Sequence, residues 1–142
     1  LVPSTFDLVI TNPPYLEGNS SNPSPEKRKN SANIETEVDL GTWLNFSAKF
    51  LKPGGNISLI HRADRLDHIL ALMRTSFGGL SVYPLWPKTG RPAKRVIVSG
   101  IKGSASPTKI LPGVTIHNAD GSYTAPVQAA LTGEKLLADL LN

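Results

Sequence analysis

The sequence contains no cysteine among its 142 residues. This absence excludes disulfides, thiolate metal sites and cysteine nucleophiles, and it fits a cytoplasmic protein. The three histidines do not have the spacing of metal ligands, so we predict no metal site. A Ser/His/Asp signature of nucleophilic catalysis is also lacking.

Long apolar runs are lacking as well. No run approaches the ~20 residues that a membrane-spanning helix needs, so we expect no membrane partner. The first residues have neither the basic start nor the small-residue cleavage site of a secretory signal peptide. With 39% hydrophobic residues the chain can build a packed core, and its length suits one domain over residues 1–142. Because it starts at Leu1 rather than at methionine, we expect a piece of a longer protein.

Acidic residues are absent from the whole span between His68 and Ala119. The net charge is +4, and this span carries seven of the cations: Arg74, Lys88, Arg91, Lys94, Arg95, Lys102 and Lys109. A second basic cluster is Lys27-Arg28-Lys29. Such a distribution is compatible with a solvated basic face and equally with a surface for a polyanion, where each phosphate contact releases counterions.

Hydrophobic patterning predicts strands that alternate with helices along most of the chain. The expected strands are Phe6–Thr11, Asn56–His61, Leu80–Leu85 and Ala93–Ile101. The expected helices are Glu35–Leu51, Asp64–Phe77 and Pro126–Leu141. Residues 16–34 and 102–125 are expected to be loops, the latter with a turn at "NADGSY".

Several residues have expected roles in these elements. Lys52-Pro53-Gly54-Gly55 and Gly78-Gly79 should stop the first two helices. Asp64 could cap the second helix, and Trp43 should pack in the core.

The order of elements predicts an α/β fold with a largely parallel sheet. The last two expected strands have no helix between them, which indicates an antiparallel edge pair. This pattern is that of the second half of a doubly wound sheet. It would leave one side of the sheet unpaired, and because a long exposed edge is a liability we expect further strands upstream.

The most informative stretch is "FDLVITNPPY", in which an apolar strand runs into Asn12-Pro13-Pro14-Tyr15. In open α/β sheets, sites lie beyond the carboxyl ends of the strands. Each proline forces the residue before it into an extended conformation, and neither has an N–H group. The Asn12 side-chain oxygen and the Pro13 carbonyl therefore offer two acceptors, and Tyr15 follows with a flat ring.

This set suits methylation of a planar amino group, such as adenine N6 or a glutamine amide. Two acceptors on its N–H bonds would aim the delocalised lone pair, and Tyr15 could stack on a base, which is worth ~1–3 kcal/mol. The methyl donor would be an activated sulfonium, so alignment could supply ~7–11 kcal/mol of the barrier without a strong base. The alternative is a strand-terminating turn with a buried tyrosine.

"FDLVITNPPY" resembles motif IV of class I S-adenosylmethionine-dependent methyltransferases that act on exocyclic or amide nitrogens. The downstream segments "LKPGGNISLIHRADRLDHIL", "VYPLWPKTGRPAKRVIVSGIKG" and "HNADGSYT" resemble the tRNA(Val) adenine-N6-methyltransferases and their relatives with a methyltransferase "small" domain. The resemblance spans nearly the whole chain. It implies a Rossmann-like fold, S-adenosylmethionine as cofactor, and an adenine beside the tRNA anticodon as substrate.

The sequence departs from that family in one respect. The family's Gly-rich cofactor loop, which precedes motif IV, is absent, and both glycine pairs follow expected helices. We therefore expect the C-terminal half of a methyltransferase domain, without its N-terminal cofactor half and inactive alone. No cofactor-binding residue can be assigned.

Candidate RNA-backbone contacts are the basic residues Arg91, Lys94 and Arg95, followed by Lys27, Arg28 and Lys29. His61, Arg62 and Asp64 follow the second strand and could line a substrate pocket or simply connect strand to helix. Trp86 could belong to the core or contact nucleic acid.

The sequence thus predicts an RNA adenine-N6-methyltransferase, with tRNA as the expected partner, in which Asn12, Pro13, Pro14 and Tyr15 form the catalytic motif. The alternatives are a methyltransferase acting on glutamine N5 of a release factor or on guanine N2 of ribosomal RNA, and a non-catalytic RNA-binding module. The oligomeric state is not predicted.

Overall fold

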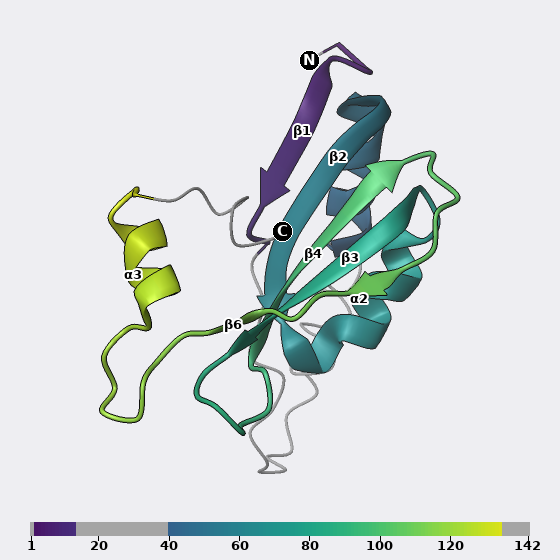
Figure 1. The fold of residues 1–142 in the computed structure, drawn as a ribbon. Coiled ribbons are helices and arrows are strands. Elements are labelled where there is room, and N and C mark those ends of the chain that lie inside the picture. The colour runs from purple at the N-terminus through teal and green to yellow at the C-terminus, as the bar shows by residue number, and fades with distance from the viewer. Residues whose placement is uncertain (1, 14–39, 135–142) are drawn as a thin grey trace, which may run out of the picture.

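The computed structural model describes residues 2–13 and 40–134 of the chain. In these residues one six-stranded sheet forms the centre of the molecule (Figure 1). Its strands are β1 (Phe6–Thr11), β2 (Leu51–Arg62), β3 (Phe77–Trp86), β4 (Arg95–Lys102), β5 (Lys109–Ile110) and β6 (Val114–Thr115). Along the sheet they follow the order β1-β2-β4-β3-β5, and β6 also pairs with β3.

Strand directions are mixed. β1 is parallel to β2, whereas β4 is antiparallel to both β2 and β3. The short strands β5 and β6 run parallel to β3 on its outer side. The predicted α/β class and the antiparallel pair of the last two long strands are therefore confirmed. β4 inserts between β2 and β3, and this position aligns the end of β2 with the start of β4.

Helices cover one face of the sheet. Residues 40–50 are helical, a 3-10 turn spans Ala63–Arg65, and α2 spans Leu66–Met73. Figure 1 shows the helix over residues 40–50 and α2 behind the sheet, while α3 (Ala125–Leu131) lies apart to one side. No helix in the described ranges is long and apolar enough to cross a membrane.

The core lies between the sheet and this helix layer. It contains Leu40 and Leu44 from the helix over residues 40–50 and Ile69 and Met73 from α2, as the 3.6-residue periodicity predicts. The sheet contributes alternate residues, among them Leu51, Ile57, Leu59, Leu80, Val82, Val96 and Val98. Burial of every second strand residue fixes the register, because a slip by one residue would turn the apolar side chains to the other face.

The first predicted helix stop is correct to within one residue, because the helix ends at residue 50, whereas the stop predicted at Gly78-Gly79 is wrong. Lys52-Pro53-Gly54-Gly55 lies inside β2, where the pairing with β1 jumps from Phe6↔Leu51 to Leu8↔Asn56. Gly54 has a φ of 77°, so it turns this irregular stretch without ending the strand. The helix ends before Leu51, which begins β2, and its predicted residues 35–39 lie outside the described residues.

Gly78 and Gly79 lie in β3, because α2 ends at Met73 and the strand begins at Phe77. A Cβ atom on Gly78 would lie 1.9 Å from the carbonyl oxygen of Ser104. The glycine therefore permits a close approach of the segment after β4, and the hydrogen bond from Gly79 N to Ser106 O, 2.9 Å long, holds that segment in place. The sequence predicted a helix cap here because a glycine that ends a helix and a glycine that permits a close backbone contact look the same in sequence.

Two predictions about single side chains are also wrong. Asp64 does not cap a helix: its carboxylate accepts hydrogen bonds from the guanidinium of Arg62, because the chain enters α2 through a 3-10 turn. Trp43 is 41% exposed and packs edge-on against Phe46 rather than in the core.

The predicted loop 102–125 contains β5, β6 and a turn at Asn118–Gly121.

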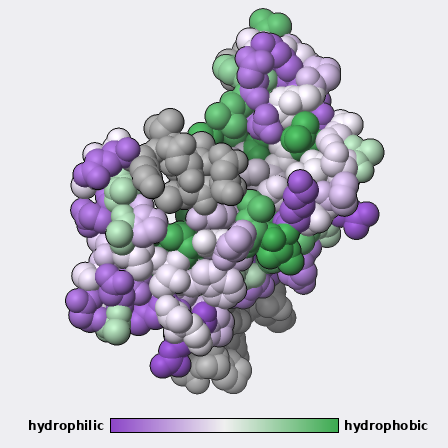
Figure 2. Space-filling view, viewed as in Figure 1, coloured by the Kyte–Doolittle hydropathy of each residue, from purple (hydrophilic) through white to green (hydrophobic). Residues whose placement is uncertain are grey.

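The other face of the sheet is partly bare in the described residues. Leu8 and Ile10 of β1 share the face of Asn56 and Ser58 and are 53% and 76% exposed. Figure 2 shows hydrophobic surface in the region of β1 on this face. β1 pairs with β2 alone in the described part of the chain, in keeping with the expected unpaired side.

Candidate functional site

Sheet register places several predicted site residues at one end of the sheet. Thr11, the last residue of β1, pairs with Leu59, so Asn12 follows two residues before the level where β2 ends at Arg62. Arg62 at the end of β2 pairs with Arg95 at the start of β4. Arg95 in turn pairs with Leu85 near the end of β3. We call this end of the sheet the carboxyl edge, after β1, β2 and β3, which all end there.

Asn12 and Pro13 follow β1 at the carboxyl edge. Asn12 is exposed and Pro13 is buried. A buried proline fixes the backbone next to an exposed amide, which suits a side chain that must hold a ligand without moving. Pro14 and Tyr15 lie outside the described residues, so the predicted stacking ring has no described position.

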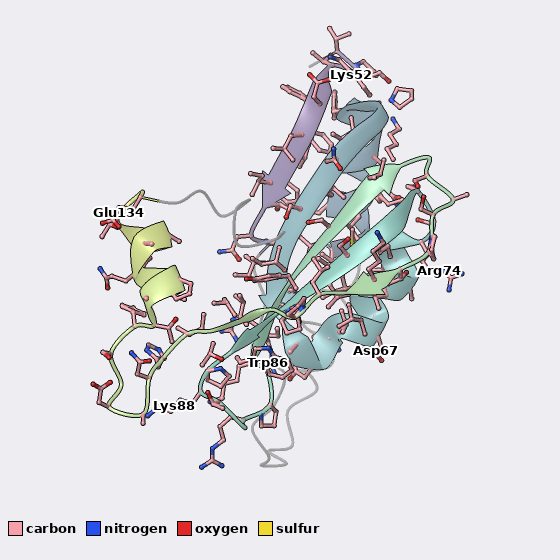
Figure 3. All side chains as sticks on the ribbon, in the orientation of Figure 1. Lys52, Asp67, Arg74, Trp86, Lys88 and Glu134 are labelled. Carbon is pink, nitrogen blue, oxygen red and sulfur yellow. The ribbon has the colours of Figure 1, made fainter. Side chains whose placement is uncertain are left out.

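Asp7, at the start of the same strand, lies away from this edge. Its carboxylate pairs with the ammonium of Lys52 at 2.8 Å. Figure 3 shows Lys52 at one end of the sheet and Trp86 and Lys88 at the other. Both groups of this ion pair are largely exposed, so the pair contributes little to stability.

His61 serves the strand-to-helix connection rather than a pocket. It follows Ile57 and Leu59 in the alternation of β2, so it faces the helix layer, and it is 6% exposed. Burial lowers the pKa of His61 below its usual value of 6.5, although a backbone hydrogen bond with Arg62 acts in the opposite direction. A neutral imidazole under the edge fits a structural role.

Arg62 and Asp64 form a two-pronged pair at the same connection. Arg62 Nε donates to Asp64 Oδ1 at 2.9 Å, and a second guanidinium nitrogen donates to Asp64 Oδ2. These hydrogen bonds hold the pKa of Asp64 below its usual value. Because Asp64 uses both oxygens on Arg62, the geometry favours the structural interpretation over a pocket-lining one.

The basic connection between β3 and β4 lies at the carboxyl edge. Arg91 N donates to Lys88 O at 3.1 Å and closes a tight turn there. The backbone of Ala63 donates to Lys94 O, also at 3.1 Å, which ties this connection to the end of β2. Arg91 and Lys94 are exposed and Arg95 is half-buried, so the structure brings these three predicted RNA contacts together next to the end of β2. Lys27, Arg28 and Lys29 lie outside the described residues.

Trp86 belongs to the packing of this edge. It is half-buried, and its indole Nε1 donates to Pro112 O at 3.1 Å. Gly113 lies under it, where an added Cβ would be 2.9 Å from the indole nitrogen. The tryptophan thus holds the segment that leads into β6, although it does not belong to the hydrophobic core between the sheet and the helices.

Sequence reasoning missed an aromatic pair at this edge. His117 and Tyr123 form an isolated antiparallel bridge, and their rings stack with centroids 5.1 Å apart. The signal "NADGSY" predicted a turn between them but neither the hairpin nor the pairing of the two rings. Two aromatic residues that flank a tight turn would have been the signal, since cross-strand neighbours touch.

Among the described residues, neither glycine pair precedes a helix as a Gly-rich cofactor loop does. A site for S-adenosylmethionine needs backbone that approaches the ligand closely at a Gly-rich loop, usually before a helix. The two glycine pairs lie near the starts of β2 and β3, at the end of the sheet opposite to the carboxyl edge. Neither glycine pair therefore forms such a loop.

Curated relatives resemble most of the chain. No protein-family model matches it. It is 31% identical over 122 residues to the tRNA1(Val) (adenine(37)-N6)-methyltransferase of Actinobacillus pleuropneumoniae serotype 7 (strain AP76), and 32% identical over 123 residues to that of Glaesserella parasuis serovar 5 (strain SH0165). Each match covers 84% of the chain and 49% of the relative. The chain is a distant homologue of these methyltransferases. It spans about half the length of the curated relatives it matches.

Solved structures agree with this relation. The crystal structure of Atu636 from Agrobacterium tumefaciens, described as a predicted O-methyltransferase, matches 93% of the chain with a TM-score of 0.73 and 25% identity. The chain covers 53% of that structure. TTHA0409 from Thermus thermophilus, assigned provisionally as a DNA modification methylase, shares the fold with a TM-score of 0.50 and 15% identity. The fold is thus a partial Rossmann-like methyltransferase fold, as the sequence predicted.

Proposed function

We propose that residues 1–142 are one part of an S-adenosylmethionine-dependent methyltransferase that methylates the exocyclic amino group of adenine in RNA, with tRNA as the expected substrate. The observation that carries the proposal is the position of Asn12-Pro13, directly after β1 at the carboxyl edge. The relation to tRNA1(Val) (adenine(37)-N6)-methyltransferases supports the choice of adenine and of tRNA. A cytoplasmic location belongs to the same proposal.

Asn12 and Pro13 would hold the amino group through its two N–H bonds. The side-chain oxygen of Asn12 and the carbonyl of Pro13 are acceptors, and a carbonyl before a proline has no competing N–H donor on the next residue. With both N–H bonds engaged, the nitrogen lone pair points away from the base plane. Bound S-adenosylmethionine would supply the methyl group as an activated sulfonium. The proton lost from the amino group would leave to solvent or to an acceptor of this motif.

The basic connection supports RNA over a protein substrate. Lys88, Arg91, Lys94 and Arg95 lie along one connection beside the ends of β1 and β2. Cations in such an arrangement suit a chain of phosphates. A base inside folded RNA must be splayed out to reach the edge, and backbone contacts on both sides of that base would hold the distorted strand.

The test uses the product of the complete reading frame that contains these residues. The protein is incubated with S-adenosylmethionine and with bulk tRNA from cells that lack the gene, and the digested RNA is analysed by mass spectrometry. We expect new N6-methyladenosine. New N2-methylguanosine would show that the methylated base is guanine instead of adenine. The absence of any methylated nucleoside would contradict the proposal for tRNA.

Replacing Asn12 tests the role of the motif. Asn12→Ala should abolish methyl transfer, because one of the two acceptors is lost, and should leave binding of S-adenosylmethionine nearly unchanged. Arg74→Ala is the control, because Arg74 is exposed on the distant end of α2. Equal activity of Asn12→Ala and the unmodified enzyme would show that Asn12 does not hold the substrate.

A further inference from the structure

A second aromatic feature lies at the carboxyl edge, apart from the Asn12–Tyr15 motif. The rings of His117 and Tyr123 are stacked at an interplanar angle of 25°. Tyr123 is 48% exposed, whereas His117 is half-buried beneath it. One face of the tyrosine is thus backed by the imidazole, and much of the remaining ring surface is open to solvent.

The hairpin that carries this pair is held by its own polar groups. Asn118 Nδ2 donates to Ser122 Oγ at 3.0 Å and to Tyr123 O at 3.1 Å. The carboxylate of Asp120 accepts from the backbone N–H and the hydroxyl of Ser122, and these hydrogen bonds lower the pKa of Asp120. The polar side chains of the turn are used inside it, so the tyrosine is the group that the hairpin presents.

The hairpin is fastened to the basic connection. His117 N donates to Pro87 O at 3.1 Å, and Ile116 N donates to Trp86 O at 2.7 Å. The ammonium of Lys88 donates to Ala119 O at 3.0 Å. Figure 3 shows Trp86 and Lys88 at the lower end of the sheet, beside the loop that carries this turn. Lys88 is therefore held against the hairpin that carries Tyr123.

We propose that Tyr123 is a stacking site for an unpaired RNA base, with the turn from Lys88 to Arg91 on the adjacent phosphates. This inference rests on the proposed action on RNA and assigns a base contact additional to the one predicted for Tyr15. A tyrosine loses little rotamer freedom on binding, and every base has a face that can stack on it. The site would orient a nucleotide near the target base without reading its identity.

The surroundings of Tyr123 favour a nucleotide over a protein partner. The neighbouring residues Asn118, Ala119, Asp120 and Ser122 are exposed and mostly polar. Figure 2 shows mainly hydrophilic surface at this end of the molecule. A protein hot spot needs an aromatic anchor inside a well-packed, desolvated patch, which these residues do not provide. A base needs only a ring to stack on and a cation near its phosphate.

The test measures binding of a single-stranded RNA oligonucleotide that carries one 2-aminopurine to the product of the complete reading frame. Stacking should quench the fluorescence of the 2-aminopurine in the unmodified protein. Tyr123→Ala should weaken binding roughly 5- to 150-fold, the range for one stacked base, and should remove the quenching. Tyr123→Phe should preserve both, because the ring is retained. Phe46→Ala is the matched control, since Phe46 is 49% exposed but lies on the helix layer.

Tyr123→Leu distinguishes stacking from a structural role, because leucine keeps apolar bulk over His117 without an aromatic face. Its affinity should fall as in Tyr123→Ala while its thermal unfolding stays close to that of the unmodified protein. Binding and quenching equal to those of the unmodified protein in Tyr123→Leu would overturn the inference. Loss of RNA binding in Tyr123→Ala without any methyl transfer by the unmodified protein would retain this inference and contradict the proposed reaction instead.

Discussion

His61 illustrates how a side chain at a functional edge can serve the fold. Its position after an apolar strand made it a candidate pocket residue, yet the alternation of β2 turns it onto the helix layer. Burial removes the imidazole from water, and this loss of solvation lowers the pKa of His61. Because the pKa of a buried, neutral group differs between the folded and unfolded states, such a group makes the free energy of unfolding depend on pH.

The folded state takes up a proton at His61 less readily than the unfolded chain, whose pKa is near the usual 6.5. The stabilising contribution is therefore complete above that value and is lost as the pH falls below it. We expect the free energy of unfolding in urea to fall as the pH decreases below about 6.5. His61→Leu should reduce this slope, and an unchanged slope would show that His61 titrates normally in the folded protein.

Single residues were predictable from the sequence where local rules decide them. The end of β1 at Thr11 is correct, because a double proline after an apolar run allows few other structures. Trp43 was misplaced because the periodicity of its helix cannot tell a core position from the border of the apolar stripe. The position of Tyr123 over His117 depends on the pairing of the hairpin, which composition alone does not specify.

At the scale of elements, the glycines of β3 caused the largest error of assignment. Gly78-Gly79 looked like the end of a helix, whereas the helix had ended at Met73 and the chain was already extended. Strand propensity around Phe77 is hidden by the two glycines, which are poor strand residues in general. Their presence is explained by a contact far along the chain, with the segment at Ser104.

Substitution of Gly78 tests this explanation. Gly78→Ala would place a Cβ 1.9 Å from a backbone oxygen, so β3 or the segment after β4 must shift. We expect a loss of about 1–3 kcal/mol or more in the free energy of unfolding, as for other overpacked sites. Gly41→Ala is the control: its Cβ would meet Leu72 at 3.8 Å, and alanine favours the helix by about 0.5–1 kcal/mol. Equal stabilities of the two variants in urea unfolding would contradict the close contact.

At the scale of the whole molecule, the order of elements was predictable and the insertion of β4 was less so. Alternating strands and helices gave the α/β class, and the helix-free connection gave the antiparallel pair. The sequence did not indicate that β4 would lie between β2 and β3, because strand order depends on long-range pairing. That insertion brings the basic connection to the end of β2, which no local pattern could reveal.

The distribution of charge over the molecule predicts how RNA binding responds to salt. Arg91→Ala and Lys94→Ala should each weaken binding to different RNA sequences by a similar factor. Each should also reduce the slope of log K against log salt by about 1, if one phosphate contact is lost. Arg74→Ala also removes one positive charge, but at a position far from Lys88, as Figure 3 shows. It should leave the slope unchanged. A slope that is equally reduced by Arg74→Ala would mean that net charge alone determines binding.

The single-sided pairing of β1 has a consequence for motion. β4 is held by ladders on both sides, whereas β1 is held by one parallel ladder to residues far along the chain, such as Leu8 to Asn56. Closing so long a loop costs conformational entropy. The side chains of β1 are largely exposed, so the free energy gained from their burial offsets little of that cost. Among the four long strands of the described residues, β1 is therefore the one that opens at the lowest free energy. Asn12 follows its last residue, so the stiffness of the Asn12-Pro13 segment depends on what contacts the edge of β1 opposite to β2.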